Sequence, residues 1–103
     1  MYALLVAATI NVVSTVPPFD ADNVIFRTNV HIITFDQPVV SQQVEMIDSE
    51  GCKVSQSSAA AGSRVIVQMK ACTRIGYPVG VMKVKWTVNG ESGEYDLHIQ
   101  HHH

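Results

Sequence analysis

The sequence predicts a single small all-β domain, built as an antiparallel sandwich of about seven strands. The chain has 103 residues, which is enough for one hydrophobic core. Its composition is that of a globular protein, because 47% of the residues are hydrophobic and 16% are charged. Apolar and polar residues alternate in short stretches, and turn signals recur about every 8 to 12 residues, the spacing of a sandwich or barrel. No stretch of useful length has the period of a helix.

Two segments are set apart from the predicted domain, which spans residues 9–100. Residues 1–8 form an apolar arm that is far shorter than the roughly 20 residues needed to cross a bilayer. We therefore expect no membrane span, and a strand is a better interpretation of the arm than a secretory signal. The three histidines at 101–103 resemble the remnant of a purification tag and carry no functional meaning.

The first two predicted strands lie on either side of a proline-rich turn. The first covers residues 9–16 and ends at Pro17-Pro18, because proline has no N–H group to donate to a neighbouring strand. The second covers residues 29–35, and its side chains alternate between two faces. One face carries His31, Ile33 and Phe35, and the other carries Val30, Ile32 and Thr34. Both faces are largely apolar, which predicts a central strand or one covered on its second side.

Three shorter strands are predicted in the middle of the chain, over residues 43–47, 52–56 and 64–70. The first two are joined by a tight turn of polar residues and glycine at 48–51. Residues 57–63 are small and polar, and we expect a loop there. They lack the GxxxxGK[ST] pattern of a phosphate-binding loop.

The last two strands form a hairpin around Asn89-Gly90. This dipeptide is a strong hairpin signal, because a type I′ turn needs positive φ at both central residues. The apolar residues that alternate with polar ones on the two strands are Met82, Val84, Trp86, Val88, Tyr95, Leu97 and Ile99. We expect Trp86 in the core of the sandwich, and a hydrophobic ligand pocket around it is the alternative.

The register of this hairpin follows from its turn and its charges. A two-residue loop places Lys83 opposite Asp96, and it places Lys85 opposite Glu94. Cross-strand pairs of opposite charge stabilise a sheet by about 0.2–1 kcal/mol each. The alternative is a four-residue loop that keeps the same faces but places Lys83 opposite His98.

Four stretches of the sequence carry recognisable motifs. They read V-V-S-T-V-P at 12–17, F-D-Q-P-V at 35–39, G-V-M-K-V-K-W-T-V at 80–88 and Y-D-L-H-I at 95–99. They resemble the V-x-S-x-x-P, F-S-x-P-V, G-x-Y-x-V-x-W-x-V and F-x-V motifs of two related families. One is the bacterial immunoglobulin-like domain of surface-layer type, and the other is the CopC family of copper-resistance proteins. The resemblance covers residues 9–100 and implies an immunoglobulin-like β-sandwich.

The resemblance also implies where copper would bind, and this sequence departs from the family there. CopC proteins bind Cu(II) through an N-terminal histidine and an Asp-x-His loop between the last two strands. Here the loop reads N-G-E-S at 89–92, and Thr9 and Ile10 stand where the N-terminal segment begins. A tight Asn-Gly hairpin does not supply the imidazole and carboxylate ligands that suit Cu(II). The resemblance therefore implies the sandwich without the CopC copper ligands.

The weak candidates for metal ligands are His31, Asp96 and His98. His31 lies at an inward position, where a core histidine bonded to the backbone is favoured and a ligand or pH switch is the alternative. His98 shares a face with Asp96 and Glu94, a row that would bind a metal weakly. A solvated face paired with lysines of the neighbouring strand is favoured there. We therefore predict no resident metal and no cofactor.

The two cysteines, Cys52 and Cys72, are too far apart in sequence for a CxxC motif. Their even number permits a disulfide, and two buried free thiols are an equal alternative. Cysteine usage does not specify the compartment. An exported chain would reach a virion, a cell surface or the periplasm.

Charge and motifs bear on the class of function. Lys and Arg total seven against nine Asp and Glu, and a formal charge of −2 offers no basic surface to nucleic acid. The sequence has no nucleophile elbow, HExxH or GxGxxG motif, so we expect no enzyme. We predict a non-catalytic immunoglobulin-like module that works by protein–protein contact, as a decoration or accessory protein of a virion or bacterial surface structure. A periplasmic copper carrier of CopC type with altered ligands is the alternative, and an enzyme is the third option.

The apolar arm is the predicted site of contact. Leu4, Leu5 and Val6 are consecutive apolar residues, and burying each is worth about 1.5–3 kcal/mol. Such an arm can extend the first strand of its own sandwich, pair with the edge of a neighbouring subunit, or insert into a partner. Sandwich edges invite strand addition, so we expect self-association or contact with a protein partner.

Overall fold

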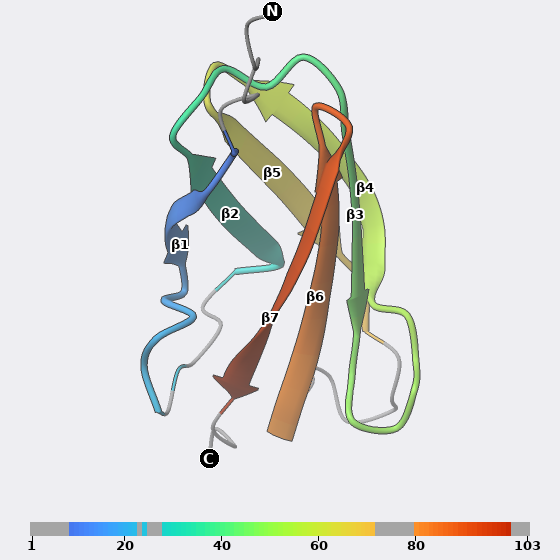
Figure 1. Cartoon of the computed structure of the whole chain (residues 1–103). Coiled ribbons are helices and arrows are strands. Elements are labelled where there is room, and N and C mark those ends of the chain that lie inside the picture. Colours follow the sequence, from blue (N-terminus) through green and yellow to red (C-terminus); the bar gives the residue numbers. More distant parts are fainter. Residues whose placement is uncertain (1–8, 23, 25–27, 72–79, 100–103) are drawn as a thin grey trace, which may run out of the picture.

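Seven short strands form two antiparallel sheets that pack face to face (Figure 1). The computed structural model describes residues 9–22, 24, 28–71 and 80–99. The strands are β1 (Val12–Val16), β2 (Val30–Phe35), β3 (Gln42–Ile47), β4 (Ser55–Ala61), β5 (Arg64–Met69), β6 (Gly80–Val88) and β7 (Glu91–Ile99). The four-stranded sheet has the order β1-β2-β5-β4, and the three-stranded sheet has the order β3-β6-β7. The predicted all-β, immunoglobulin-like sandwich is therefore confirmed.

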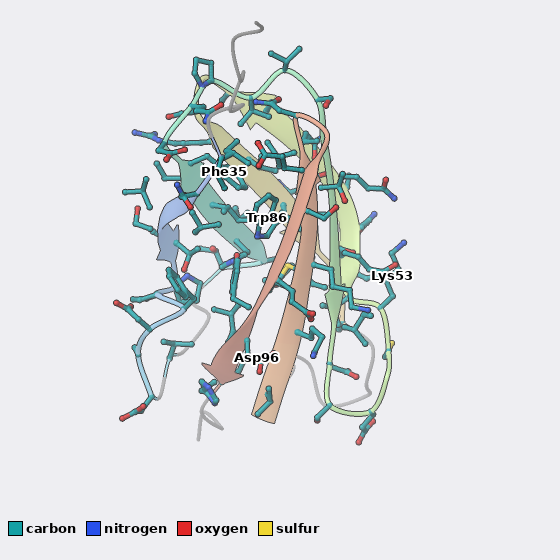
Figure 2. The ribbon with its side chains drawn as sticks, viewed as in Figure 1. Phe35, Lys53, Trp86 and Asp96 are labelled. Atoms are coloured by element: carbon teal, nitrogen blue, oxygen red, sulfur yellow. The ribbon has the colours of Figure 1, made fainter. Side chains whose placement is uncertain are left out.

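The core lies between the sheets and is built from the inward side chains of both. Alternation along β6, for example, buries Trp86 and exposes Lys85 and Thr87 on either side of it. The rings of Phe35 on β2 and Trp86 on β6 meet edge to face, with their centroids 5.1 Å apart (Figure 2). Trp86 is 8% exposed, which confirms its expected core position. The buried hydrophobic residues are Ile10, Val24, Ile33, Phe35, Val44, Met46, Val54, Val65, Val67, Met69, Met82, Val84, Trp86, Val88, Leu97 and Ile99.

The last hairpin has the predicted two-residue register. Asn89 and Gly90 have φ of 52° and 81°, as a type I′ turn requires. Lys83 lies opposite Asp96, while its Nζ atom lies 3.3 Å from a carboxylate oxygen of Glu94 on the diagonal. The four-residue loop is therefore wrong.

The loop predicted over residues 57–63 is also wrong, because β4 occupies Ser55–Ala61 and the turn is confined to Gly62-Ser63. The strand predicted over 52–56 is displaced accordingly. β4 lies at an edge of the four-stranded sheet and is exposed along most of its length. Its short serine and alanine side chains therefore have no need to alternate in polarity, and a stretch without alternation gives no strand signal.

Several predictions concern residues outside the described ranges. Cys52 takes part in a disulfide. Cys72, its predicted partner, lies outside the described residues, so the pairing stays a prediction. The arm over 1–8, with Leu4, Leu5 and Val6, and the tag remnant at 101–103 also lie outside them. Within the described ranges, no helix is long and apolar enough to cross a membrane.

Candidate functional site

The outer face of the three-stranded sheet is charged and internally balanced. Glu45, Lys85 and Glu94 lie side by side across β3, β6 and β7. Lys83 approaches Glu94 at 3.3 Å, and Lys53 approaches Glu45 at 3.7 Å. Exposed ion pairs of this kind contribute only about 0–1 kcal/mol each. This face is therefore a solvated surface whose charges largely neutralise one another.

The outer face of the four-stranded sheet has a different character. Val16, Ile32, Ile66 and Ala59 are successive cross-strand partners on β1, β2, β5 and β4, and we call these four residues the apolar row. On β1, β2 and β5 the row residues alternate with buried residues, so they point away from the core. Val16 is 60% exposed, Ala59 is exposed, and the two isoleucines are half-buried. An apolar row thus crosses the whole sheet on its solvent side.

The positions beside the apolar row are mostly uncharged. Thr34 lies opposite Arg64 on one side of the row, and Val30 lies opposite Gln68 on the other. Among the strand residues described on this face, Arg64 is the one that carries a charge. The structure confirms the predicted central position of β2, and the second apolar face of that strand forms the middle of this surface. An apolar patch with a polar rim is typical of a protein-binding surface.

The edge strand β4 borders a small groove against β3, with a volume of about 150 Å³. The Nε2 atom of Gln42 donates to the carbonyl oxygen of Ser58 at 3.1 Å, and the Ser58 hydroxyl donates to Oε1 of Gln42 at 2.6 Å. Because the backbone groups of successive residues point to opposite sides of a strand, Ala60, two residues after Ser58, turns its N–H and C=O to the same outer side as Ser58. Gln42 therefore occupies part of this edge, which makes the edge less suited to strand addition than the face is to packing.

A buried histidine joins the two sheets. Nδ1 of His31 on β2 lies 2.9 Å from the carbonyl oxygen of Val16, and Nε2 lies 2.7 Å from the hydroxyl of Tyr95 on β7. A carbonyl only accepts, so we assign the proton to Nδ1, and Nε2 then accepts from the tyrosine hydroxyl. Burial lowers the pKa of His31 to about 4 and raises the pKa of Tyr95. The predicted core histidine bonded to the backbone is confirmed, whereas its tyrosine partner was not predicted.

The structure does not bring the three candidate metal ligands together. His31 is fully buried and both of its ring nitrogens are hydrogen-bonded, whereas Asp96 and His98 are exposed on the outer side of β7. In the part of the chain that the structure describes, no three His, Cys, Asp or Glu residues form a group that could hold a metal ion.

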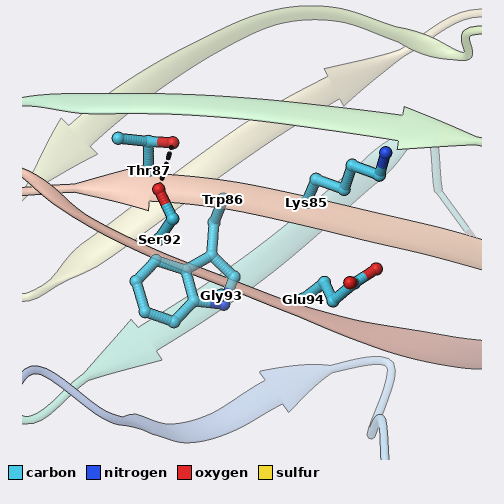
Figure 3. Close-up of a pocket in the computed structure, with 6 residues that line it drawn as sticks. All are labelled: Lys85, Trp86, Thr87, Ser92, Gly93 and Glu94. Carbon is cyan, nitrogen blue, oxygen red and sulfur yellow. Dashed lines mark hydrogen bonds between the residues drawn. The ribbon is translucent and has the colours of Figure 1, made fainter.

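An open hollow of about 410 Å³ lies along the last hairpin (Figure 3). Its lining consists of Lys85, Trp86, Thr87, Ser92, Gly93 and Glu94. The Trp86 ring packs against the backbone of Gly93, where an added Cβ would lie 2.6 Å from Cε2 of the ring. The Thr87 and Ser92 hydroxyls are 3.1 Å apart. Since the tryptophan is largely buried and the other side chains are polar, this hollow does not resemble a hydrophobic ligand pocket.

Comparisons with known proteins bear on the fold. No protein-family model matches the sequence, and no curated protein matches it. Among solved structures, the crystal structure of CopC from Methylosinus trichosporium OB3b matches with a TM-score of 0.71 and 18% sequence identity, over 92% of this chain and 97% of that chain. The fold is CopC-like. At this level of identity the likeness shows the fold alone, and the resemblance to surface-layer domains stays a prediction.

In this CopC-like fold, the first described residues meet the last hairpin, where the resemblance places the copper ligands. The carboxylate oxygens of Glu91 lie 3.2 and 3.3 Å from the backbone N of Ile10, which donates to them. Oδ1 of Asn89 accepts from the backbone N–H groups of Val40, at 2.7 Å, and Ser41, at 3.1 Å. Both hairpin side chains therefore hold neighbouring backbone in place. The role of Glu91 was not predicted from the sequence.

Proposed function

We propose that this chain is a non-catalytic β-sandwich module that binds another protein through the apolar row of its four-stranded sheet. An accessory protein of a virion or of a bacterial surface structure would use such a face to attach to a neighbouring subunit. The contrast between the two outer faces carries the proposal. One face has at least one charged residue on each of its three strands, acidic on β3 and β7 and basic on β6, and the other has an apolar residue on every strand.

Burial of the row would supply the binding free energy. Fully burying a valine or isoleucine side chain is worth about 1.5–3 kcal/mol, and Val16 is still 60% exposed in the isolated chain. Strands with one solvated face usually alternate apolar with polar residues, as β6 does. Ile32 and Ile66 depart from that alternation at the centre of the sheet, which is where an interface is best protected from water.

The substitution Ile66→Glu tests this function, because it places a carboxylate in the middle of the apolar row. Cells that produce the chain are treated with a short-range cross-linker, and the cross-linked species are identified by mass spectrometry. We expect a defined partner with the wild-type chain. With Ile66→Glu the yield should fall at least about tenfold, which corresponds to about 1.4 kcal/mol of binding free energy.

Ile47→Glu is the matched control. Ile47 is also a half-buried isoleucine, but it lies on the outer face of the three-stranded sheet, opposite Lys83. This variant should keep the partner, and thermal melting of both variants checks that they fold. Partner capture by folded Ile66→Glu at the wild-type level would refute the proposal. Turnover of a defined substrate by the tag-free protein would refute the non-catalytic part of it.

A copper carrier is the second candidate, and the CopC-like fold favours it. The test is a Cu(II) titration of the chain without residues 101–103. Binding tighter than about 1 µM that is lost in His98→Ala or His31→Ala would favour the carrier. Cu(II) binding weaker than that, unchanged by either substitution, would favour the interaction module.

A further inference from the structure

We infer that the partner of the apolar row is a second copy of this chain, packed face to face about a two-fold axis parallel to the strands. The inference rests on the proposed function, because it takes the apolar row as a protein-binding surface. A two-fold dimer presents the same patch from both copies, so the patch must be complementary to itself. The apolar row meets that condition in size and in charge.

The order of side-chain sizes along the row gives the complementarity in shape. The row has a valine at one edge of the sheet, two isoleucines at its centre and an alanine at the other edge. An axis parallel to the strands reverses the row of the second copy. Val16 then faces the partner's Ala59, and Ile32 faces the partner's Ile66, so that large side chains meet small ones at both edges. An axis along the row would stack the two alanines on each other and leave a gap there, at a loss of packing contacts.

Charge is compatible with the same arrangement. Thr34 and Arg64 occupy equivalent places on the two central strands, beside the apolar row. Reversal of the second copy therefore puts Arg64 opposite the partner's Thr34, whose hydroxyl accepts hydrogen bonds. The two arginines then lie about one strand spacing, roughly 4.8 Å, apart along the row, so they do not face each other directly across the interface.

The size of the face sets the expected strength. Four strands spaced about 4.8 Å apart and about 20 Å long give a face of roughly 400 Å² in projection. Each of the two copies contributes one such face, and protruding side chains add to its area. The dimer would therefore bury roughly 1,000 Å² in total, which is near the lower limit for a specific interface. We therefore expect a weak dimer that dissociates on dilution.

Charge complementation between two variants tests both the partner and the axis. Sedimentation of the full chain is measured at protein concentrations from about 1 µM to about 1 mM. EDTA is present throughout, to exclude metal-mediated contact through the histidines at 101–103. The wild type should dimerise over this range. Ile32→Glu and Ile66→Lys should each weaken dimerisation at least about tenfold, because each buries a charge. An equimolar mixture should restore it, because the carboxylate of one variant then faces the ammonium of the other.

Each outcome supports or overturns the inference. A wild-type chain that is monomeric throughout overturns it, and the cross-linking result with Ile66→Glu then still decides the proposed function separately. A dimer that both variants keep places the contact elsewhere. Loss of the dimer without rescue in the mixture overturns the strand-parallel axis. Ile47→Glu, on the other sheet, should dimerise as the wild type does.

A second pair of variants covers the case in which a substitution at the half-buried isoleucines prevents folding. Val16 and Ala59 are exposed, so Val16→Glu and Ala59→Lys should both fold. The proposed axis places these two positions opposite each other as well. Each variant alone should dimerise more weakly than the wild type, and their mixture should regain the dimer. A mixture no stronger than either variant alone would count against the axis.

Discussion

The Nε2 atom of His31 lies 2.7 Å from the hydroxyl oxygen of Tyr95, and this hydrogen bond connects the two sheets of the sandwich. The other ring nitrogen lies 2.9 Å from the carbonyl oxygen of Val16. Within the described part of the chain, no buried side-chain nitrogen or oxygen lacks a hydrogen-bond partner. The pair therefore links β2 to β7 across an otherwise apolar interior.

Removal of the Tyr95 hydroxyl deprives Nε2 of His31 of this donor. We expect Tyr95→Phe to lower the free energy of unfolding by about 1–3 kcal/mol, the usual cost of breaking a buried hydrogen bond from one side. Urea unfolding at neutral pH measures the change. Thr87→Val is the control, because it removes an exposed hydroxyl bonded to Ser92 and should cost less than about 0.5 kcal/mol. An unchanged urea midpoint for Tyr95→Phe would show that the inter-sheet bond adds nothing.

His31 should also make the stability depend on pH. Burial holds its pKa at about 4 in the folded chain, against 6.5 for the ordinary side chain. Below pH 6.5 the unfolded chain therefore binds more protons than the folded chain, and stability falls as the pH falls. The contribution is fully present above pH 6.5 and is lost progressively toward pH 4.

The size of this effect is bounded by the shift itself. Each pKa unit corresponds to about 1.4 kcal/mol, so the loss amounts to about 3.5 kcal/mol at most. Urea midpoints measured between pH 4 and 6.5 follow it, with His31→Gln as the comparison. The substituted chain should lose the part of the slope due to His31. An equal slope in both proteins would assign the pH dependence to other groups.

Gly93 should tolerate no larger side chain, because the Trp86 ring occupies the space beside it. A Cβ at position 93 would lie 2.6 Å from Cε2 of the ring, and the ring is held in the core against Phe35. We expect Gly93→Ala to destabilise the domain by about 1–3 kcal/mol through overpacking. Thermal melting measures this, with the neighbouring exposed Ser92→Ala as control. In a Trp86→Leu background the penalty should shrink, and a penalty of the same size there would rule out the ring as its cause.

Cys52 should be linked to Cys72. Cys52 takes part in a disulfide, and the sequence contains two cysteines. Peptide mapping without reductant should find the two residues in one linked fragment. A cross-link that closes a loop of this length stabilises a protein by about 3 kcal/mol, so Cys52→Ser and Cys72→Ser should destabilise it equally. A reduced chain that melts at the temperature of the oxidised one would contradict this.

The features that the sequence by itself determined are those that depend on neighbouring residues. The Asn89-Gly90 turn and the Lys83–Asp96 pair lie within one hairpin, so their geometry follows from turn chemistry and from alternation along two adjoining strands. The inward positions of Trp86 and His31 follow from the same alternation. The strand β4 was not predicted, because its small side chains lie at an exposed edge of the sheet. Burial gives no reason there for polar and apolar residues to alternate.

The tertiary structure alone decided which residues became neighbours across the sheets. The apolar row exists because the strand order β1-β2-β5-β4 places Val16, Ile32 and Ile66 side by side. Likewise, His31 and Tyr95 meet although 64 residues separate them in the chain. Alternation specifies the face on which a side chain lies, but strand order depends on the packing of the whole core. The candidate interface and the buried hydrogen bond therefore emerge only when long-range contacts are formed.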